Sequence, residues 1–483
     1  MYRSSLRLSF RIMAGVLLSL TYGLGVQAQQ ATAERPNIVF ILADDLGCKD
    51  LGCYGTDYYR TPNLDRLASQ GMAFFDAYAN GANCAPTRAA LMSGQYAPRT
   101  GVYTVNNSDR GPAARRRVIP TRNNTTLSPD VVTLAEVLRD AGYATGHVGK
   151  WHLGEGEQSG PQGQGFDVNV AGWHRGHPRS YFSPYQNPEL SDGPEGEYLT
   201  DRLTTEAIAF MEQDRDAPFF LYLPYYTVHT PIQPHPEWLS RIEQRQPGEL
   251  HTNARYGAMV DAMDFQIGRV LGALDRLGIA DNTLVVFMSD NGGKSPETDM
   301  APWRGSKGMF YEGGIRVPLI VRWPGMVSPG STCNQPVITL DFYPTLAAIV
   351  GAMLPADQPI DGQDLSALLA DGGAELGREA LYWHFPAYLN GYRGMVGEGP
   401  ADGWRATPCS VIRAGDWKLI EYLEDGRLEL FNLADDPGEQ KNLAQENTGK
   451  AQDLLEMLGD WRDSVQAPIP TEPNPAYRAG GER

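Results

Sequence analysis

The stretch from Pro36 to Ala43 constrains the fold more than any other part of the chain. It is a continuous apolar run without alternation, and it ends at two aspartates, Asp44 and Asp45. A strand with one face in water alternates apolar and polar residues, whereas a strand buried on both faces of a parallel sheet does not. The run therefore predicts an inner strand of a parallel sheet.

Further strand-like segments follow along the chain, and segments with helical periodicity lie between them. Strand-like runs lie at 144–148, 218–223 and 283–288, and helical periodicity is found at 62–70, 132–141, 201–212 and 254–277. Strands that alternate with helices are typical of a doubly wound α/β fold. We expect a large, mostly parallel sheet with helices on its faces.

The C-terminal quarter has a different pattern. A segment rich in Asp, Gly and Ala, with a short helix at 365–369, precedes short strands at 410–413, 416–422 and 428–432, and a helix follows at 449–466. This predicts a smaller α+β domain, a short antiparallel sheet plus a helix. The expected organisation is a signal peptide at 1–28, a large catalytic domain at 29–377, a C-terminal subdomain at 378–467 and a flexible tail at 468–483.

The N-terminal residues have the pattern of a secretory signal peptide. Arg3, Arg7 and Arg11 precede an apolar run at 12–26, which ends close to Ala28. The run is shorter than the ~20 residues of a spanning helix. We expect export to the periplasm or the medium, and no membrane span after cleavage.

The charge balance limits the possible partners. The formal net charge is −17, which argues against nucleic acid. An anionic substrate would need a locally basic pocket.

Cys84-Ala85-Pro86-Thr87-Arg88 predicts the start of a helix with a reactive side chain at its tip. Proline is tolerated in the first turn, so Cys84 should lie just before the helix and face unpaired backbone N–H groups. The alternative is a capped helix with a buried thiol, because free cysteines usually pack as small hydrophobic groups.

Polar residues follow each of the main predicted strands. Ligands of open α/β sheets bind beyond the carboxyl ends of the strands, where these residues should meet. They are Asp44 and Asp45, Lys150 and His152, His229, and Asp290 and Asn291. The aspartates and Asn291 offer only oxygen ligands, which suit a hard cation such as Ca²⁺ or Mg²⁺. Taken alone, Asp44-Asp45 or Asp290-Asn291 is also typical of an ordinary turn.

The pattern Cys-x-Pro-x-Arg, followed by Leu91, Ser93 and Gly94, resembles the signature of the type I sulfatases of the alkaline phosphatase superfamily. In that family a formylglycine-generating or equivalent maturation enzyme oxidises the cysteine to formylglycine. Position 87 is most often Ser or Ala in the family and is Thr in this chain, a difference that bears on maturation efficiency.

The resemblance also implies roles for the matching residues. The metal ligands would be Asp44, Asp45, Asp290, Asn291 and the modified Cys84, around one Ca²⁺ per chain. Sulfate would be bound by Lys150 and Lys307. The hydrated aldehyde would be held by Arg88 and His152, and His229 would protonate the leaving oxygen.

Two basic segments are candidates for contact with the rest of the substrate. The loop 173–181 mixes aromatic and cationic residues, of which His174, Arg175, His177 and Arg179 suit sugar rings and anionic groups. A second run of arginines, at 110–122, would attract a sulfated polymer if it lies near the mouth of the site. Both segments are also typical of ordinary surface loops.

Four cysteines besides Cys84 allow three disulfide pairings or free thiols: Cys48, Cys53, Cys333 and Cys409.

The sequence thus predicts a sulfatase that hydrolyses a sulfate monoester, on a sulfated glycan rather than a small molecule. The alternatives are an arylsulfatase with small aryl substrates, a phosphodiesterase or phosphonate hydrolase of the same superfamily, and a glycan-binding protein with an unconverted Cys84.

Overall fold

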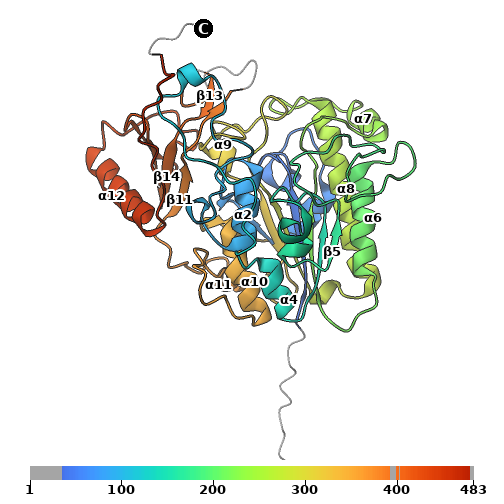
Figure 1. The fold of residues 1–483 in the computed structure, drawn as a ribbon. Coiled ribbons are helices and arrows are strands. Elements are labelled where there is room, and N and C mark those ends of the chain that lie inside the picture. Colours follow the sequence, from blue (N-terminus) through green and yellow to red (C-terminus); the bar gives the residue numbers. More distant parts are fainter. Residues whose placement is uncertain (1–34, 392–398, 402, 479–483) are drawn as a thin grey trace, which may run out of the picture. The chain divides into compact units, whose positions relative to one another are not determined.

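In the computed structural model an eight-stranded sheet forms the centre of the protein (Figure 1). The structure describes residues 35–391, 399–401 and 403–478. Across the sheet the strands are β5 (Val168–Val170), β4 (Ala144–Val148), β6 (Phe219–Pro224), β1 (Asn37–Ala43), β7 (Thr283–Ser289), β8 (Leu319–Arg322), β2 (Met72–Phe74) and β9 (Ser331–Cys333). All pairs are parallel except those of β8, so the prediction of a large, mostly parallel sheet is confirmed.

The predicted first strand lies inside the sheet, between β6 and β7. Its alternate residues enter two different cores, with Ile38 and Phe40 in one and Val39 and Ile41 in the other. Each face therefore buries its own row of side chains, which explains the unbroken apolar run.

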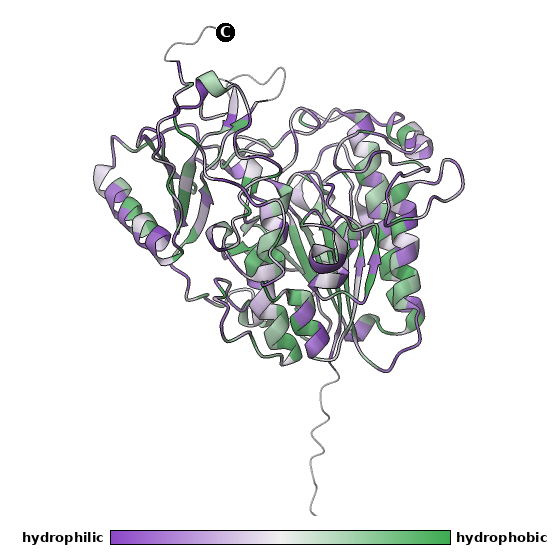
Figure 2. Ribbon diagram, in the orientation of Figure 1, coloured by the Kyte–Doolittle hydropathy of each residue, from purple (hydrophilic) through white to green (hydrophobic). Residues whose placement is uncertain are grey.

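Helices cover both faces of this sheet, with their apolar sides turned toward the strands (Figure 2). One face packs against α1 (Pro62–Ser69), α6 (Leu199–Met211), α7 (Pro236–Ile242) and α8 (Ala254–Leu277). The other packs against α2 (Cys84–Ser93), α4 (Leu134–Asp140), α10 (Phe342–Val350) and α11 (Ser366–Ala370). The long helix α8 has the predicted bounds because the Asn253 side chain caps its start and Gly278, at φ 69°, ends it.

A second, antiparallel sheet forms the C-terminal region. Its strands, in spatial order, are β11 (Leu381–Phe385), β14 (Cys409–Ala414), β15 (Trp417–Tyr422) and β16 (Leu428–Asn432). Helix α12 (Thr448–Ser464) packs on this sheet, with Trp461 stacked on Tyr382 at 4.7 Å between ring centroids. The predicted sheet plus helix is confirmed, and β11 is a strand that the sequence pattern missed.

The remaining elements are short. They are η1 (Gly52–Tyr54), β3 (Ala77–Tyr78), α3 (Ala97–Thr100), η2 (Ala113–Arg115), α5 (Gly156–Ser159), η3 (Gln162–Gln164), η4 (Ala280–Asn282), α9 (Glu312–Ile315), β10 (Val337–Ile338), η5 (Thr339–Asp341), β12 (Leu389–Asn390) and β13 (Trp404–Ala406).

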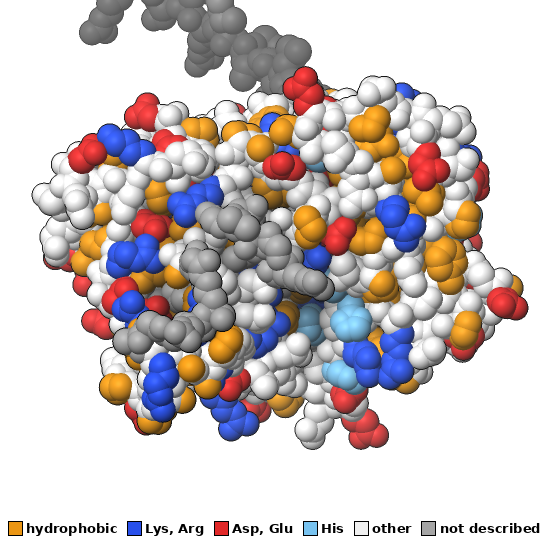
Figure 3. Space-filling view, turned by 90° about the horizontal axis from the view of Figure 1, so that it is seen from above, with side chains coloured by type: hydrophobic (Ala, Val, Ile, Leu, Met, Phe, Trp, Pro, Cys, Tyr) orange, Lys and Arg blue, Asp and Glu red, His pale blue; other side chains and the backbone are white. Residues whose placement is uncertain are grey.

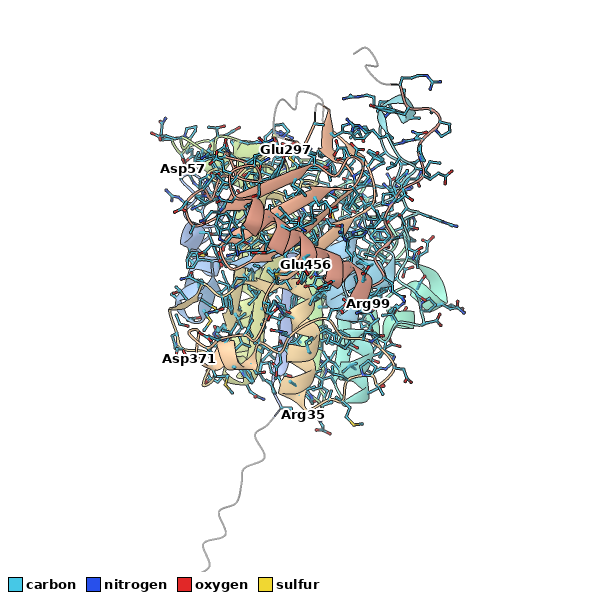
Figure 4. All side chains as sticks on the ribbon, turned by 90° about the vertical axis from the view of Figure 1, so that its left-hand side faces the viewer. Arg35, Asp57, Arg99, Glu297, Asp371 and Glu456 are labelled. Carbon is cyan, nitrogen blue, oxygen red and sulfur yellow. The ribbon has the colours of Figure 1, made fainter. Side chains whose placement is uncertain are left out.

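The loops that follow the parallel strands gather at one end of the sheet. Arg35, just before β1, lies at the lower end of the molecule in Figure 4, whereas Asp57 and Glu297, in the segments after β1 and β7, lie at the upper end. Ala43 of β1 pairs with Ser289 of β7, so the next residues, Asp44 and Asp290, leave the sheet at the same level. The strand pairing thus brings the predicted metal ligands together.

The expected flexible tail is anchored over its described part. The backbone N–H of Ile119 donates to the Glu472 carbonyl, and the N–H groups of Asn474 and Arg478 donate to the carbonyls of Arg117 and Ala114. These three hydrogen bonds join the described part of the tail to residues 114–119, and the flexibility of the tail stays a prediction.

The other organisational predictions are not tested. Residues from Arg35 onward form one compact unit, which leaves the boundary after residue 377 a prediction. The expected signal peptide lies outside the described residues. Among the described helices, none has both the length and the apolar character needed to cross a membrane.

Candidate active site

Helix α2 begins at Cys84 itself, one residue earlier than the sequence predicts. Pro86 is then the third helical residue, which it can be because the first four N–H groups of a helix have no intrahelical acceptor. The Thr87 hydroxyl accepts a hydrogen bond from the Gly81 N–H at 3.1 Å, so it holds the turn that precedes Cys84. The whole helix is buried, which fixes the position of the thiol.

Cys84 faces a cluster of buried carboxylates. Its sulfur lies 3.5 Å from Asp44 Oδ1 and 4.0 Å from Asp45 Oδ1. Potential ligand atoms of Cys84, Asp44, Asp45 and His229 all lie within 4.8 Å of one another. Asp290 joins them, since its Oδ1 accepts a hydrogen bond from the Asp45 backbone N–H at 3.2 Å.

Each of the three carboxylates has its own buried cation. Lys150 Nζ lies 2.7 Å from Asp44 Oδ2, and Lys307 Nζ lies 2.6 Å from Asp45 Oδ1. Arg88 donates to Asp290 Oδ2 through Nε and Nη2, at 2.9 and 2.8 Å.

Each of the three guanidinium nitrogens of Arg88 donates a hydrogen bond, because Nη1 makes one more contact. Its Nη1 donates to the Lys150 carbonyl at 2.7 Å. Arg88 therefore links the strand end that carries Asp290 to the one that carries Lys150.

Burial dominates the electrostatics of this cluster. Burial raises the pKa of Asp44, and the charges of Asp290 and Asp45 add to the rise against the opposing effect of Lys150. Burial also opposes ionisation of Asp45, but Lys307 and His229 outweigh it and hold its pKa below the usual range. Burial and the Asp290 charge raise the pKa of the Cys84 thiol to about 12.

Two histidines border the cluster. His229 Nε2 lies 3.6 Å from Asp45 Oδ2, and the Tyr181 hydroxyl donates to the His229 carbonyl at 2.8 Å. His152 has φ 64°, and its buried Nδ1 has no hydrogen-bond partner among the described residues. Burial and the nearby lysines lower the pKa of both imidazoles well below the usual value.

The donor set fits a hard divalent cation. The oxygens of Asp44 and Asp45 converge, and Asp290 Oδ1 lies 3.2 Å from the Asp45 backbone nitrogen. The buried Oδ1 of Asn291 lacks a partner among the described residues. The other end of that amide is fixed, since Nδ2 donates to Asp45 Oδ1 at 2.9 Å. An orphaned amide oxygen beside three carboxylates is suited to Ca²⁺ or Mg²⁺ rather than to a softer metal.

A cavity of about 440 Å³ opens above Cys84. In Figure 3 histidines, in pale blue, and basic side chains, in blue, gather around a hollow. Of the expected substrate-binding residues, His174, Arg175, His177 and Lys307 line the cavity, together with the catalytic candidates Cys84, His152 and His229. Lys150 and Arg88 do not line it. Arg179 does not line it, and instead donates to the exposed Gln186 side chain.

Other lining residues were not singled out from the sequence. They include Asn83, Asn106, Lys294 and Arg405. Of the arginine run at 110–122, only Arg110 lines the cavity. Lys294 lies three residues after Asn291, a spacing that could have suggested it, whereas nothing near Arg405 in the sequence indicates a site.

The cysteines outside the site form no disulfide. All five cysteines lie in the described residues and are free thiols. The sequence left open three disulfide pairings or free thiols, and the structure shows free thiols.

Comparison with known proteins identifies the family. The sulfatase family profile matches residues 36–352, and the profile of the N-sulphoglucosamine sulphohydrolase C-terminal region matches residues 304–462. A sulfatase of Formosa agariphila is 36% identical, with 94% of this chain and 92% of the relative covered. The steryl-sulfatase of Mus musculus is 31% identical, with 92% and 84% covered.

A solved structure supports the same conclusion. The crystal structure of Ps i-CgsB in complex with k-i-k-neocarrahexaose has a TM-score of 0.76 and 31% identity, and covers 91% of this chain and 95% of that chain. The chain thus belongs to the type I sulfatase family of the alkaline phosphatase superfamily, as the Cys84 motif predicts, and is a sulfuric ester hydrolase.

Proposed function

We propose that this sulfatase removes sulfate from a carbohydrate, using formylglycine made from Cys84 and one bound Ca²⁺. The observation that carries the proposal is the place of Cys84, at the buried start of α2, 3.5 Å from Asp44 and at the floor of a cavity rich in basic residues. A maturation enzyme would supply the oxidation of the thiol to the aldehyde.

A hydrated aldehyde explains why a cysteine must be converted. The hydrate has two hydroxyl groups on one carbon, so one attacks sulfur and displaces the sugar oxygen. The other then loses its proton, the aldehyde re-forms and sulfate leaves. A side chain with a single hydroxyl or thiol would stay sulfated.

The surrounding residues fix the charges of this reaction. Lys150 and Lys307, each within 3 Å of a site carboxylate, would hold the oxygens of the sulfate group and stabilise charge that develops there. His152 would bond the hydrate. Arg88 would keep Asp290 and Lys150 in position through its three hydrogen bonds.

His229 would act as the general acid. It lines the cavity next to Asp45, where it can donate a proton to the oxygen of the departing sugar. Asp44, Asp45, Asp290 and Asn291 would hold the Ca²⁺, which when bound acts as a Lewis acid toward oxygen.

A carbohydrate is favoured over a small aryl alcohol by two observations. The cavity is open and lined by polar and basic groups, and a relative with a TM-score of 0.76 has been crystallised with a neocarrahexaose. The mouse steryl-sulfatase shows that relatives at 31% identity also include an enzyme named for a steroid substrate, so aryl and steryl sulfates belong in the same assay.

Mass spectrometry of the purified protein tests the mechanism first. We expect an aldehyde at Cys84 and one bound calcium ion per chain in native spectra. In parallel assays we expect release of sulfate from sulfated sugars and no hydrolysis of a phosphodiester to its monoester and alcohol. Cys84→Ser should abolish multiple turnover while its unfolding midpoint stays close to that of the native protein. Normal turnover by Cys84→Ser, or by protein that contains only the thiol, would exclude the aldehyde mechanism.

We also propose that the chain is exported, on the pattern of residues 1–28. N-terminal sequencing of protein recovered from the periplasm or the medium should find Gln29 first; accumulation of the uncleaved chain inside the cell would contradict this.

A further inference from the structure

Ser289 is a polar residue at the end of a buried strand. It is the last residue of β7 and shares one face of that strand with Val285 and Phe287, which lie in the core that α8 covers. The Ser289 side chain is 0% exposed. A hydroxyl group in such a place is unfavourable unless it makes hydrogen bonds, so its partners indicate why a serine is present.

The Ser289 hydroxyl joins the two turns that carry the proposed calcium ligands. Its Oγ accepts a hydrogen bond at 3.1 Å from the backbone N–H of Leu46, the residue directly after Asp45. The same hydroxyl donates to the Asn291 carbonyl at 2.9 Å. One side chain thus connects the backbone that follows β1 to the backbone that follows β7.

The backbone at Asp45 needs such support. Asp45 has φ 63°, in the left-handed region, which is less favourable for aspartate than for glycine. Its own N–H donates to Asp290 Oδ1 at 3.2 Å, and the N–H of the next residue donates to Ser289. Two successive N–H groups of this turn are therefore held by residues at the end of β7.

The Asn291 side chain is held on the same side. Its Nδ2 donates to Asp45 Oδ1 at 2.9 Å, while its main-chain carbonyl accepts from Ser289. The buried Oδ1 of Asn291 has no partner among the described residues and is the oxygen that a cation would use. A set of ligands that is already in position binds more tightly, because less ordering is needed when the ion binds.

We infer that Ser289 is a positioning residue for the cation of this sulfatase. Its hydroxyl fixes the Asp45 turn against the Asn291 turn and so sets the geometry of their ligand oxygens, although Ser289 acts through these residues and not as a ligand. The inference rests on the proposed function, because it requires that Asp45 and Asn291 hold Ca²⁺.

Calorimetric titration of the calcium-free full-length protein with CaCl₂ tests this role. Ser289→Ala removes only the hydroxyl, and we expect its dissociation constant for calcium to rise about tenfold or more, as is typical when the partner of a metal ligand is lost. Ser289→Thr keeps a hydroxyl on the same carbon. It should bind calcium within about threefold of the native protein.

Thr283→Val is the matched control. Thr283 lies at the other end of β7, on the same face, is as buried as Ser289, and donates from its hydroxyl to the Ile279 carbonyl at 2.7 Å. Loss of a buried hydrogen bond should lower the urea midpoint of both Ser289→Ala and Thr283→Val, but only Ser289→Ala should weaken calcium binding. Mass spectrometry verifies that the compared preparations match in aldehyde content.

The inference is overturned if Ser289→Ala binds calcium within about threefold of the native protein, or if Thr283→Val weakens binding as much. It also fails if Ser289→Thr keeps the native urea midpoint but binds calcium as weakly as Ser289→Ala. Absence of binding by the native protein would refute the calcium site of the proposed function and this role with it. Normal binding by the native protein together with unchanged binding by Ser289→Ala would refute the role of Ser289 alone.

Discussion

Lys418 on β15 lies between two buried glutamates that come from distant parts of the chain. Its Nζ is 2.9 Å from Glu312 Oε1 and 2.8 Å from Glu439 Oε1, and the three side chains are at most 1% exposed. Glu312 begins α9, five residues after Lys307. The contact therefore joins the C-terminal sheet to the segment that carries a catalytic candidate.

The cluster around Lys418 is balanced in charge. Glu312 also pairs with Arg316 at 2.8 Å, and Arg413 pairs with Asp76 at 2.6 Å, which makes three cations and three carboxylates. Removal of one member leaves a net buried charge, and breaking a buried pair in this way costs about 3–5 kcal/mol. We predict a loss of this size in the free energy of unfolding for Lys418→Met, which preserves most of the side-chain volume.

The loss should depend on pH. Burial and the Glu312 charge already raise the pKa of Glu439, while Lys418 opposes the rise. Without Lys418 the folded-state pKa rises further above the unfolded value. A carboxyl whose pKa is raised by folding makes the folded state less stable as pH increases above its unfolded-state pKa. The variant should therefore fall further below the native protein in free energy of unfolding at pH 8 than at pH 5.5.

Urea unfolding followed by tryptophan fluorescence, at fixed calcium concentration, measures this loss. Lys441→Met is the control, since Lys441 pairs with Glu446 on the surface and its loss should change the free energy by less than about 0.5 kcal/mol. Addition of Glu439→Gln to Lys418→Met should recover part of the stability. A loss below about 1 kcal/mol for Lys418→Met, or additive effects in the double variant, would refute the argument.

Two further predictions concern catalysis. His229→Ala should lower kcat about 10²–10⁴-fold on a sugar sulfate and much less on 4-nitrophenyl sulfate, whose leaving group needs no proton; equal losses would argue against a general acid. Gly176→Ala should displace the His152 ring, since the new Cβ would lie 2.2 Å from it, and should lower kcat about tenfold without loss of stability. Gly459→Ala on α12, where a Cβ meets nothing within 4 Å, should keep full activity; unchanged kcat in Gly176→Ala would show that the loop yields instead.

Most inner strands of the fold could be predicted because a strand that is buried on both faces has an unbroken apolar sequence. β1, β6 and β7 appear as apolar runs close to their observed bounds, and β4 was predicted as a strand-like segment with the bounds it has. The strands β2 and β9 were missed because three residues are too few to show a pattern, and because the pairing of β2 with β8 and of β9 with β2 depends on distant parts of the chain. The hydrogen bonds of the tail could not be predicted for the same reason, since they reach back to residues 114–119.

Some residues of the candidate site could be predicted from the sequence and others could not. Asp44, Lys150 and Asp290 could be found because each directly follows a buried strand, so that the sheet alone brings them together. Arg405 comes from β13, a strand of the two-stranded pair with β12, and reaches the cavity only through tertiary packing. Arg179, on the same loop as Arg175, is not among the lining residues and donates to the Gln186 side chain, and its role in substrate binding stays a prediction.

The charge pairing of the inner site accounts for how it can accept both a cation and an anion. Arg88, Lys150 and Lys307 neutralise Asp290, Asp44 and Asp45, so these six buried groups carry no net charge. A divalent cation held by the carboxylate oxygens would supply a second counter-charge and would leave the two lysine charges for the sulfate oxygens proposed above. In the structure Lys150 and Lys307 each lie within 3 Å of a carboxylate, and breaking either of these buried pairs by removal of the lysine would leave a buried charge uncompensated.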